Sequence, residues 1–227
     1  MPPKAIFDGN VSDLIEIADA SKDRILGNRV LTNKTVAVCF IGLASYFEAF
    51  CKHQFAAAIN ICPQILSNFI KKRGDDSNSL KDVFKIKETI NFTLGSLLSE
   101  KYDFGSAKAI NSLYFDLLGI TPFTSTEVKK YAEFLKDRNL LVHDGGIYTY
   151  KYHEQKLNST PPRGLVHAQS LGVTKTDFNN WAGFLQKIAE KMAKATNKSM
   201  KDFINRQNIV LHEEQERAIE YISWESS

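Results

Sequence analysis

Between Val36 and Ile59 almost every residue is apolar, and the polar exceptions Ser45, Glu48 and Lys52 form a single stripe. A helix with this pattern is buried over most of its circumference, so other elements must surround it. We therefore expect it to be the central helix of the fold. The 227 residues, 43% of them hydrophobic, suffice to build a sizeable core in one domain.

The same apolar stretch, residues 35–62, is long enough to raise the question of a membrane. A spanning helix needs about twenty residues with few or no charges, whereas Glu48, Lys52 and His53 interrupt this one. No apolar leader opens the chain, and the three cysteines form no close C-x-x-C pair. The sequence therefore predicts a cytoplasmic protein without a membrane segment, a zinc site or a disulfide framework.

Several further segments show apolar residues at helical spacing. Asn10 is placed to cap the first, which includes Ile25 and ends near Gly27. The others cover residues 80–99, 107–119, 124–143 and 178–192, with a charged break at 71–79 and an undecided tail through Trp224. These patterns predict an all-α fold: an up-and-down bundle of about five helices in a single domain, residues 1–227.

One segment changes to a period of two. Tyr148, Tyr150 and Tyr152 alternate along it, and a Pro-Pro-Arg-Gly turn at 161–164 precedes another apolar run up to Val173. This predicts a small β-hairpin insertion near 147–173. An alternating aromatic face can stack on RNA bases, but it more often packs against the protein, and we expect packing.

The end of one predicted helix carries polar residues among apolar ones. These are Arg138, Asn139 and His143, and Gly145 and Gly146 follow them. A guanidinium can hold a phosphate in a fork, and an imidazole moves a proton near neutral pH. On an ideal helix Arg138 and His143 point about 140° apart. The two glycines offer a helix stop at which the last turn can loosen and the imidazole can swing toward the arginine.

Arg138, Asn139 and His143 resemble the signature of the HEPN superfamily (higher eukaryotes and prokaryotes nucleotide-binding domains), an arginine and a histidine a few residues apart, with asparagine after the arginine. The resemblance implies a helical bundle and a homodimer that cleaves RNA without a metal or other cofactor, giving a 2',3'-cyclic phosphate. It also implies a toxin or phage-defence role, with an antitoxin or nucleotidyltransferase as partner.

The resemblance further implies that Asn139 bonds the histidine or the phosphate, and that Glu48 on the central helix orients the arginine. Each residue also has a structural interpretation. Asn139 fits a surface amide, Glu48 pairs with Lys52 at i,i+4 in a solvated stripe, Arg138 fits an exposed helix arginine, and His143 fits a polar cap.

Overall charge does not choose between these functions. The net charge of +3 and the pI near 8.6 permit an anionic partner without requiring one. On the basis of the resemblance we expect a HEPN-type endoribonuclease acting on RNA. The alternative is a HEPN-fold module that binds RNA or a partner and cleaves nothing.

Overall fold

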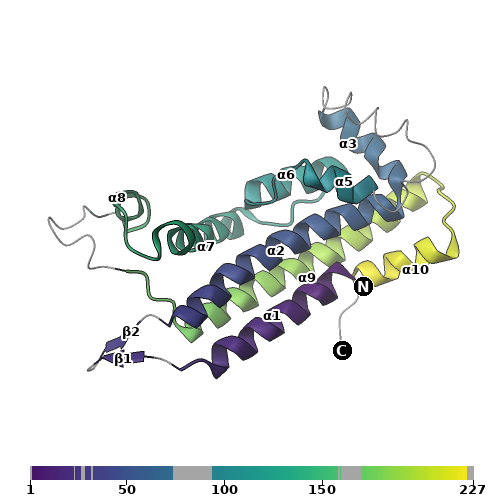
Figure 1. The fold of residues 1–227 in the computed structure, drawn as a ribbon. Coiled ribbons are helices and arrows are strands. Elements are labelled where there is room, and N and C mark those ends of the chain that lie inside the picture. The colour runs from purple at the N-terminus through teal and green to yellow at the C-terminus, as the bar shows by residue number, and fades with distance from the viewer. Residues whose placement is uncertain are drawn as a thin grey trace. The chain divides into compact units, whose positions relative to one another are not determined.

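The structure is a computed structural model that describes residues 2–22, 24–26, 29–31, 33–73, 94–157, 159 and 170–223. It is mostly helical (Figure 1), which confirms the all-α class. Nine α-helices occur in the described part: α1 Pro3–Ala20, α2 Lys34–Ile61, α3 Leu66–Arg73, α5 Leu94–Glu100, α6 Ala107–Leu118, α7 Ser125–Asp144, α8 Tyr150–Tyr152, α9 Lys175–Arg206 and α10 Glu213–Ile222. Two short turns of other helix types are η1, Pro63–Ile65, and η3, His153–Leu157.

The expected count of about five helices is wrong for the described residues. Segments interpreted as connections form short helices of their own, because α3 continues through the basic run to Arg73 and α8 replaces part of the expected hairpin. The chain also divides into two compact units. Unit 1 comprises Met1–Asp8, Glu48–Thr124 and Lys187–Ser227, and unit 2 comprises Gly9–Phe47 and Ser125–Gln186.

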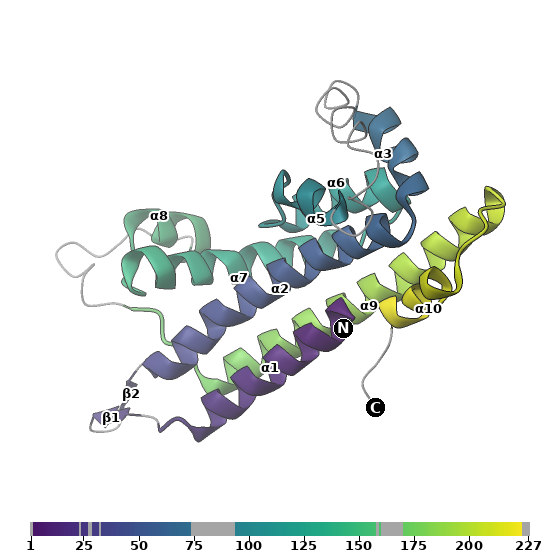
Figure 2. The same cartoon turned by 45° about the vertical axis from the view of Figure 1, so that its right-hand side comes forward.

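Aromatic side chains hold unit 2 together. Phe134 of α7 packs against Phe40 of α2 and Trp181 of α9, with ring centroids 4.7 and 5.1 Å apart. Phe47 meets Tyr131 at 5.5 Å in the same layer. Figure 2 shows α7 lying against the first half of α2 within this unit. Rings of this size bury large apolar areas, so they fix the helix that carries the candidate site.

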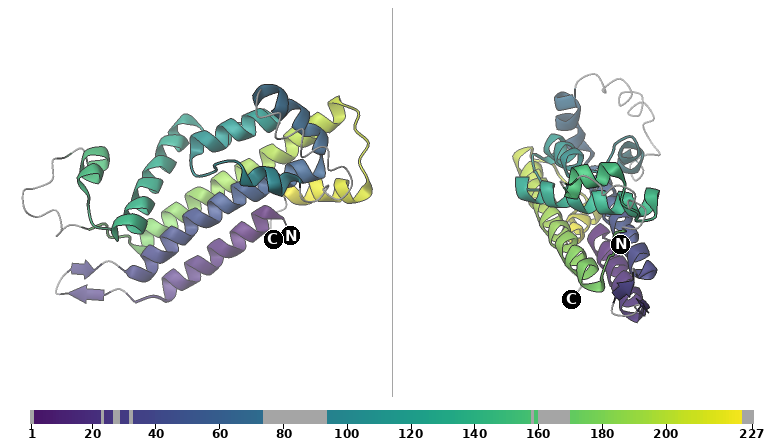
Figure 3. Two further views of the ribbon diagram at one scale, coloured as in Figure 1. Left: turned by 45° about the horizontal axis from the view of Figure 1, so that its top comes forward. Right: turned by 90° about the vertical axis from the view of Figure 1, so that its left-hand side faces the viewer.

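The first half of α2 also has α1 beside it in unit 2 (Figure 3), where Gly42 faces the side chain of Leu14. The predicted start and end of this first helix were wrong: α1 begins at Pro3 and ends at Ala20. Ile25 lies instead in a three-residue strand, β1 Arg24–Leu26, which pairs antiparallel with β2 Arg29–Leu31. Gly27 lies outside the described residues.

The start of α2 explains this earlier ending of α1. The side chain of Asn33 accepts hydrogen bonds from the backbone N–H groups of Thr35 and Val36, so it caps α2. Its amide nitrogen donates to the hydroxyl of Ser21, which follows α1. These bonds tie the two helix ends together and leave the intervening residues to reverse the chain.

Unit 1 is built around Phe55 of α2. Its ring is packed by the aromatic rings of Phe69, Tyr102, Phe104 and Tyr114, at centroid distances of 5.5 to 6.3 Å. The Tyr114 hydroxyl donates to the Cys51 carbonyl at 2.8 Å, so this buried phenol is satisfied. The interpretation of residues 36–59 as a core helix agrees with this burial in both units.

By length and composition alone, α2 is long and apolar enough to cross a membrane. Buried core helices can have the same length and composition. Half of its most apolar window is buried inside the protein. Its largest buried side chains are the phenylalanines that pack against other helices within each unit.

The helices α6 and α7 confirm the helices that the sequence predicts at 107–119 and 124–143. Ser106 caps α6 by accepting from the Ala109 N–H, and Gly119 ends it with φ of 71°. α7 begins at Ser125 with Glu127 in its first turn. Of the helix expected at 80–99, only α5 is in the described part. Residues 74–93 and Trp224 lie outside it.

The β-hairpin expected near 147–173 is not what the described residues form. Residues 150–157 are helical, and the extended pairing there is one isolated bridge, Ile147 with Ser170. The Thr149 hydroxyl caps the Tyr152 N–H at 3.2 Å, and Tyr148 stacks on the Tyr152 ring at 5.0 Å. Tyr148 and Thr149 precede the helix, so these contacts close its N-terminal end. The expected turn at 161–164 lies outside the described residues.

Candidate functional site

The Arg-Asn…His segment occupies the last turns of α7, in unit 2. Gly145 and Gly146 have φ of 60° and 84°, and the Gly146 N–H donates to the Leu140 carbonyl at 3.0 Å. This is the glycine-dependent ending of a regular helix. The chain leaves the helix only after Asp144, so His143 stays within it. The loosened last turn that the glycines predicted does not occur.

A regular helix decides which of the three residues share a face. Asn139 and His143 are four positions apart, about 40° around the helix, so they are neighbours. Both line one cavity of about 270 Å³ between α7 and the segment 149–156. Its lining comprises Lys136, Asn139, Leu140, His143, Asp144, Thr149, Lys151, Tyr152, Gln155 and Lys156.

Arg138 stands beside this face. Its Nη1 donates to the amide oxygen of Asn139 at 3.0 Å, while its Nε is buried and has no hydrogen-bond partner in the described part. Leaving a charged donor buried without a partner costs free energy that an anion's oxygen would restore. Asn139 therefore connects the guanidinium to the face that carries His143.

Asp137, directly before the arginine, is the buried centre of a second network. It accepts a hydrogen bond from the Tyr152 hydroxyl at 2.6 Å and forms an ion pair with Lys156 at 2.5 Å. Burial raises the pKa of Tyr152, and the hydrogen bond to Asp137 raises it further. Burial and the charge of Asp137 also raise the pKa of Tyr148. Both phenols are therefore neutral hydrogen-bonding groups near pH 7.

Two lysines attach the segment after α8 to α7. Lys136 of α7 forms an ion pair with Glu133 at 2.7 Å and donates to the Gln155 carbonyl at 3.1 Å. Lys156 donates to the Glu133 carbonyl at 3.4 Å in return. The hydrogen bonds of Lys136 to Gln155 and of Lys156 to Glu133 cross from one element to the other, so they fix one wall of the cavity.

Two cationic or titratable side chains of the cavity remain available. Lys151 and His143 are both exposed, and neither forms an ion pair or side-chain hydrogen bond with another described residue. A lysine and an imidazole at one opening can attract an anion and exchange a proton with it. The expected structural role of His143 as a cap through its side chain is not seen here.

Glu48, the fourth candidate, lies on α2 in unit 1, whereas Arg138, Asn139 and His143 belong to unit 2. The site is therefore described from unit 2 alone. Glu48 forms no ion pair with Lys52 in the described part of the chain. Burial raises the pKa of the Cys51 thiol in the same unit, with a further contribution from the charge of Glu48.

The described residues contain no group of three or more His, Cys, Asp or Glu side chains able to hold a metal ion. The three cysteines are buried and free. His153 is also buried. Its Nδ1 lies 3.2 Å from the Ser159 hydroxyl, and its Nε2 has no partner in the described part.

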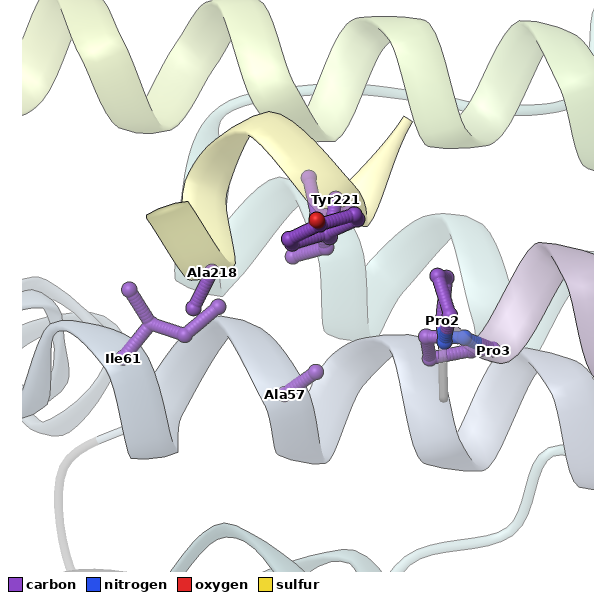
Figure 4. A pocket seen from close by; sticks show the side chains of 7 residues that line it. Pro2, Pro3, Ala57, Ile61, Ala218 and Tyr221 are labelled. Atoms are coloured by element: carbon purple, nitrogen blue, oxygen red, sulfur yellow. The ribbon is translucent and has the colours of Figure 1, made fainter. Parts of the chain in front are cut away.

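A larger cavity of about 410 Å³ lies in unit 1 (Figure 4), lined by Pro2, Pro3, Ala57, Ile61, Ala218, Tyr221 and Ile222. Its walls are apolar apart from the Tyr221 hydroxyl and backbone groups. It holds no histidine, carboxylate or lysine, so it offers neither acid–base nor phosphate-binding chemistry.

Sequence reasoning found Asn139 and His143 but missed the residues opposite them, Lys151, Tyr152 and Lys156. The reason is the expected hairpin, which placed 148, 150 and 152 on one face of a strand. The available signal was Thr149, a residue type that caps helices, directly before Tyr150. Comparison of the chain with family models, curated proteins and solved structures finds no match.

Proposed function

We propose that this chain is a metal-independent endoribonuclease of HEPN type. The observation that carries the proposal is the contact of Arg138 with Asn139, which shares a helix face and a cavity with His143. A guanidinium whose buried Nε–H has no partner among the described residues can donate to a phosphate oxygen, and an exposed imidazole can transfer a proton.

The proposed reaction is transesterification. A base removes the proton of the ribose 2'-hydroxyl, whose oxygen attacks the adjacent phosphorus, while an acid protonates the departing 5'-oxygen. The products are a 2',3'-cyclic phosphate and a 5'-hydroxyl. Arg138 would stabilise charge on the non-bridging oxygens, Asn139 would hold Arg138 in place, and His143 would transfer a proton.

One histidine cannot be base and acid at the same instant, and a continuous α7 keeps Arg138 and His143 about 140° apart. We propose that a two-fold homodimer supplies the second copy of each. Glu48 remains a proposed positioning residue for the arginine. The finer fold proposal is that the long helices of this all-α chain form the up-and-down bundle of a single HEPN-like domain.

The biological setting proposed is the cytoplasm, with RNA as substrate and with an antitoxin or nucleotidyltransferase as partner in a toxin or phage-defence system. The resemblance at 138–143 supports these proposals.

The second candidate is a HEPN-fold module that binds RNA or a partner without cleavage. One observation favours it: Asn139 and His143 line the cavity, but Arg138 does not. A cavity of this composition binds an anion even if the arginine never reaches the same phosphate as the histidine.

Cleavage assays separate the two. Purified protein is incubated with total RNA in EDTA, and wild type is compared with Arg138→Ala, His143→Ala and Lys129→Ala. Lys129 is an exposed lysine of α7 outside the cavity, so it controls for the loss of one positive charge. The nuclease proposal expects metal-resistant cleavage lost in the first two variants only. Intact RNA with every protein, or cleavage that all variants share, rejects it.

A further inference from the structure

The cavity beside Asn139 and His143 has a charge pattern that the proposed reaction does not need. It is lined by three lysines, Lys136, Lys151 and Lys156, against one carboxylate, Asp144. Transesterification at one phosphate requires a proton donor, a proton acceptor and a cation. The extra lysines therefore call for a separate explanation.

Two of these lysines form ion pairs with carboxylates of the same chain. Lys136 is paired with Glu133, and Lys156 is paired with Asp137. They stiffen the wall and contribute little net charge. The Lys156–Asp137 ion pair and the hydrogen bond of Lys136 to the Gln155 carbonyl keep the segment 149–156 in place, so the position of Lys151 relative to α7 is set by the fold.

Lys151 is the remaining cation of the cavity, and it is exposed with no carboxylate partner in the described part. Arg138, at the adjoining edge, likewise has only the amide of Asn139 as a described partner. Arg138 and Lys151 together exceed the single charge of Asp144. The opening therefore attracts anions on two sides of the Asn139–His143 face.

The size of the cavity fits one unit of a polynucleotide rather than a large cofactor. Its volume of about 270 Å³ lies just under the usual range for small-molecule sites, about 300–1,000 Å³. The lining includes the Asn139 amide and the Thr149 hydroxyl, which are suited to the polar edges of a sugar or phosphate.

We propose that this cavity is a second phosphate subsite, in which Lys151 binds the RNA phosphate next to the one held by Arg138. The inference rests on the proposed function in one respect, namely that the bound polynucleotide is RNA. Its chemistry, a phosphodiester held by one unpaired lysine, is independent of whether cleavage takes place. In this arrangement Lys136 and Lys156 are positioning residues for the wall that carries Lys151.

The test measures binding without reaction. A fluorescent single-stranded 2'-O-methyl RNA lacks the attacking hydroxyl, and its affinity for full-length protein is followed by anisotropy over a range of KCl concentrations. Wild type is compared with Lys151→Ala and with Lys129→Ala. Circular dichroism checks that each variant is folded, and substitution of an exposed lysine is expected to leave the fold intact.

Removing one phosphate contact should weaken binding roughly tenfold in Lys151→Ala. It should also reduce the slope of log affinity against log salt by about 0.7, the value for one phosphate of a single strand. A general loss of structure would not produce that defined change in slope. Lys129→Ala should stay within about twofold of wild type.

The outcomes separate this inference from the nuclease proposal. If RNA is never cleaved but Lys151→Ala shows the weaker binding and lower slope, the subsite stands and only catalysis fails. If wild type cleaves in EDTA while Lys151→Ala binds with unchanged affinity and slope, the subsite is rejected and the nuclease remains. If wild type does not bind the RNA, the inference is overturned, and binding of inorganic phosphate measured by titration calorimetry identifies a free-phosphate site instead.

Discussion

The guanidinium of Arg138 donates through Nη1 to the side-chain oxygen of Asn139, 3.0 Å away, across two adjacent positions of α7. Adjacent residues on a helix point about 100° apart, so such a contact is made only when the longer side chain bends toward its neighbour. It connects the arginine to the face that Asn139 shares with His143. The account of the site depends on this contact.

Asn139→Ala should lower RNA cleavage while leaving the fold intact, because it removes the partner that holds the guanidinium at the edge of the cavity. A hydrogen bond to a charged group is worth about 1.5–3 kcal/mol, so kcat/KM should fall by roughly one to two orders of magnitude. Steady-state kinetics on a short RNA, with Lys129→Ala as control, measures the effect. Unchanged kcat/KM would assign Asn139 to the surface.

Tyr152→Phe should destabilise the protein, because Asp137 loses a hydrogen bond while remaining buried and paired with Lys156. The loss should be about 1.5–3 kcal/mol in the free energy of unfolding at pH 7. Urea titration followed by circular dichroism measures it. Tyr150→Phe is the matched control, since Tyr150 is 65% exposed, and it should change stability by less than about 0.5 kcal/mol.

The same variant should alter stability at alkaline pH. The folded-state pKa of Tyr152 is raised above the unfolded value of about 10, so its contribution is complete below pH 10 and is lost as pH rises from there. As pH rises above 10, wild type should lose stability faster than Tyr152→Phe. Parallel stability curves for the two proteins would show that the phenol ionises equally in both states.

Glycine substitutions should have opposite signs at two positions of unit 2. Gly146 has φ of 84°, and an added Cβ would lie 3.3 Å from the Leu141 side chain. Gly146→Ala should therefore cost about 1–2 kcal/mol and lower Tm by about 2–8 °C. Gly183, within α9, has open space at its Cβ. Gly183→Ala should stabilise by about 0.5–1 kcal/mol. Differential scanning calorimetry compares them, and a stable Gly146→Ala would contradict the helix ending described.

An element can be predicted from the sequence when neighbouring residues alone determine its structure. The end of α6 follows from Gly119, since a left-handed glycine acts on its own helix. The strand expected from the alternating tyrosines was wrong, because the Thr149 hydroxyl caps the Tyr152 N–H and a helix begins at Tyr150.

The site was only partly predictable for a related reason. A single continuous segment supplied Arg138, Asn139 and His143, whereas the cation and the wall opposite them come from residues 149–156. Their approach to α7 depends on Asp137, which pairs with Lys156 and Tyr152 at separations of 19 and 15 residues. Such pairing leaves no periodic trace in the sequence.

The central claim is that these residues cleave RNA through its own 2'-hydroxyl, and the ends of the cleavage products test it most directly. A defined RNA is incubated with wild type in EDTA, and the fragments are analysed by mass spectrometry. The account predicts 2',3'-cyclic phosphate and 5'-hydroxyl ends, absent from reactions with His143→Ala. Fragments carrying 3'-hydroxyl and 5'-phosphate ends, or the same fragments from His143→Ala, would contradict it.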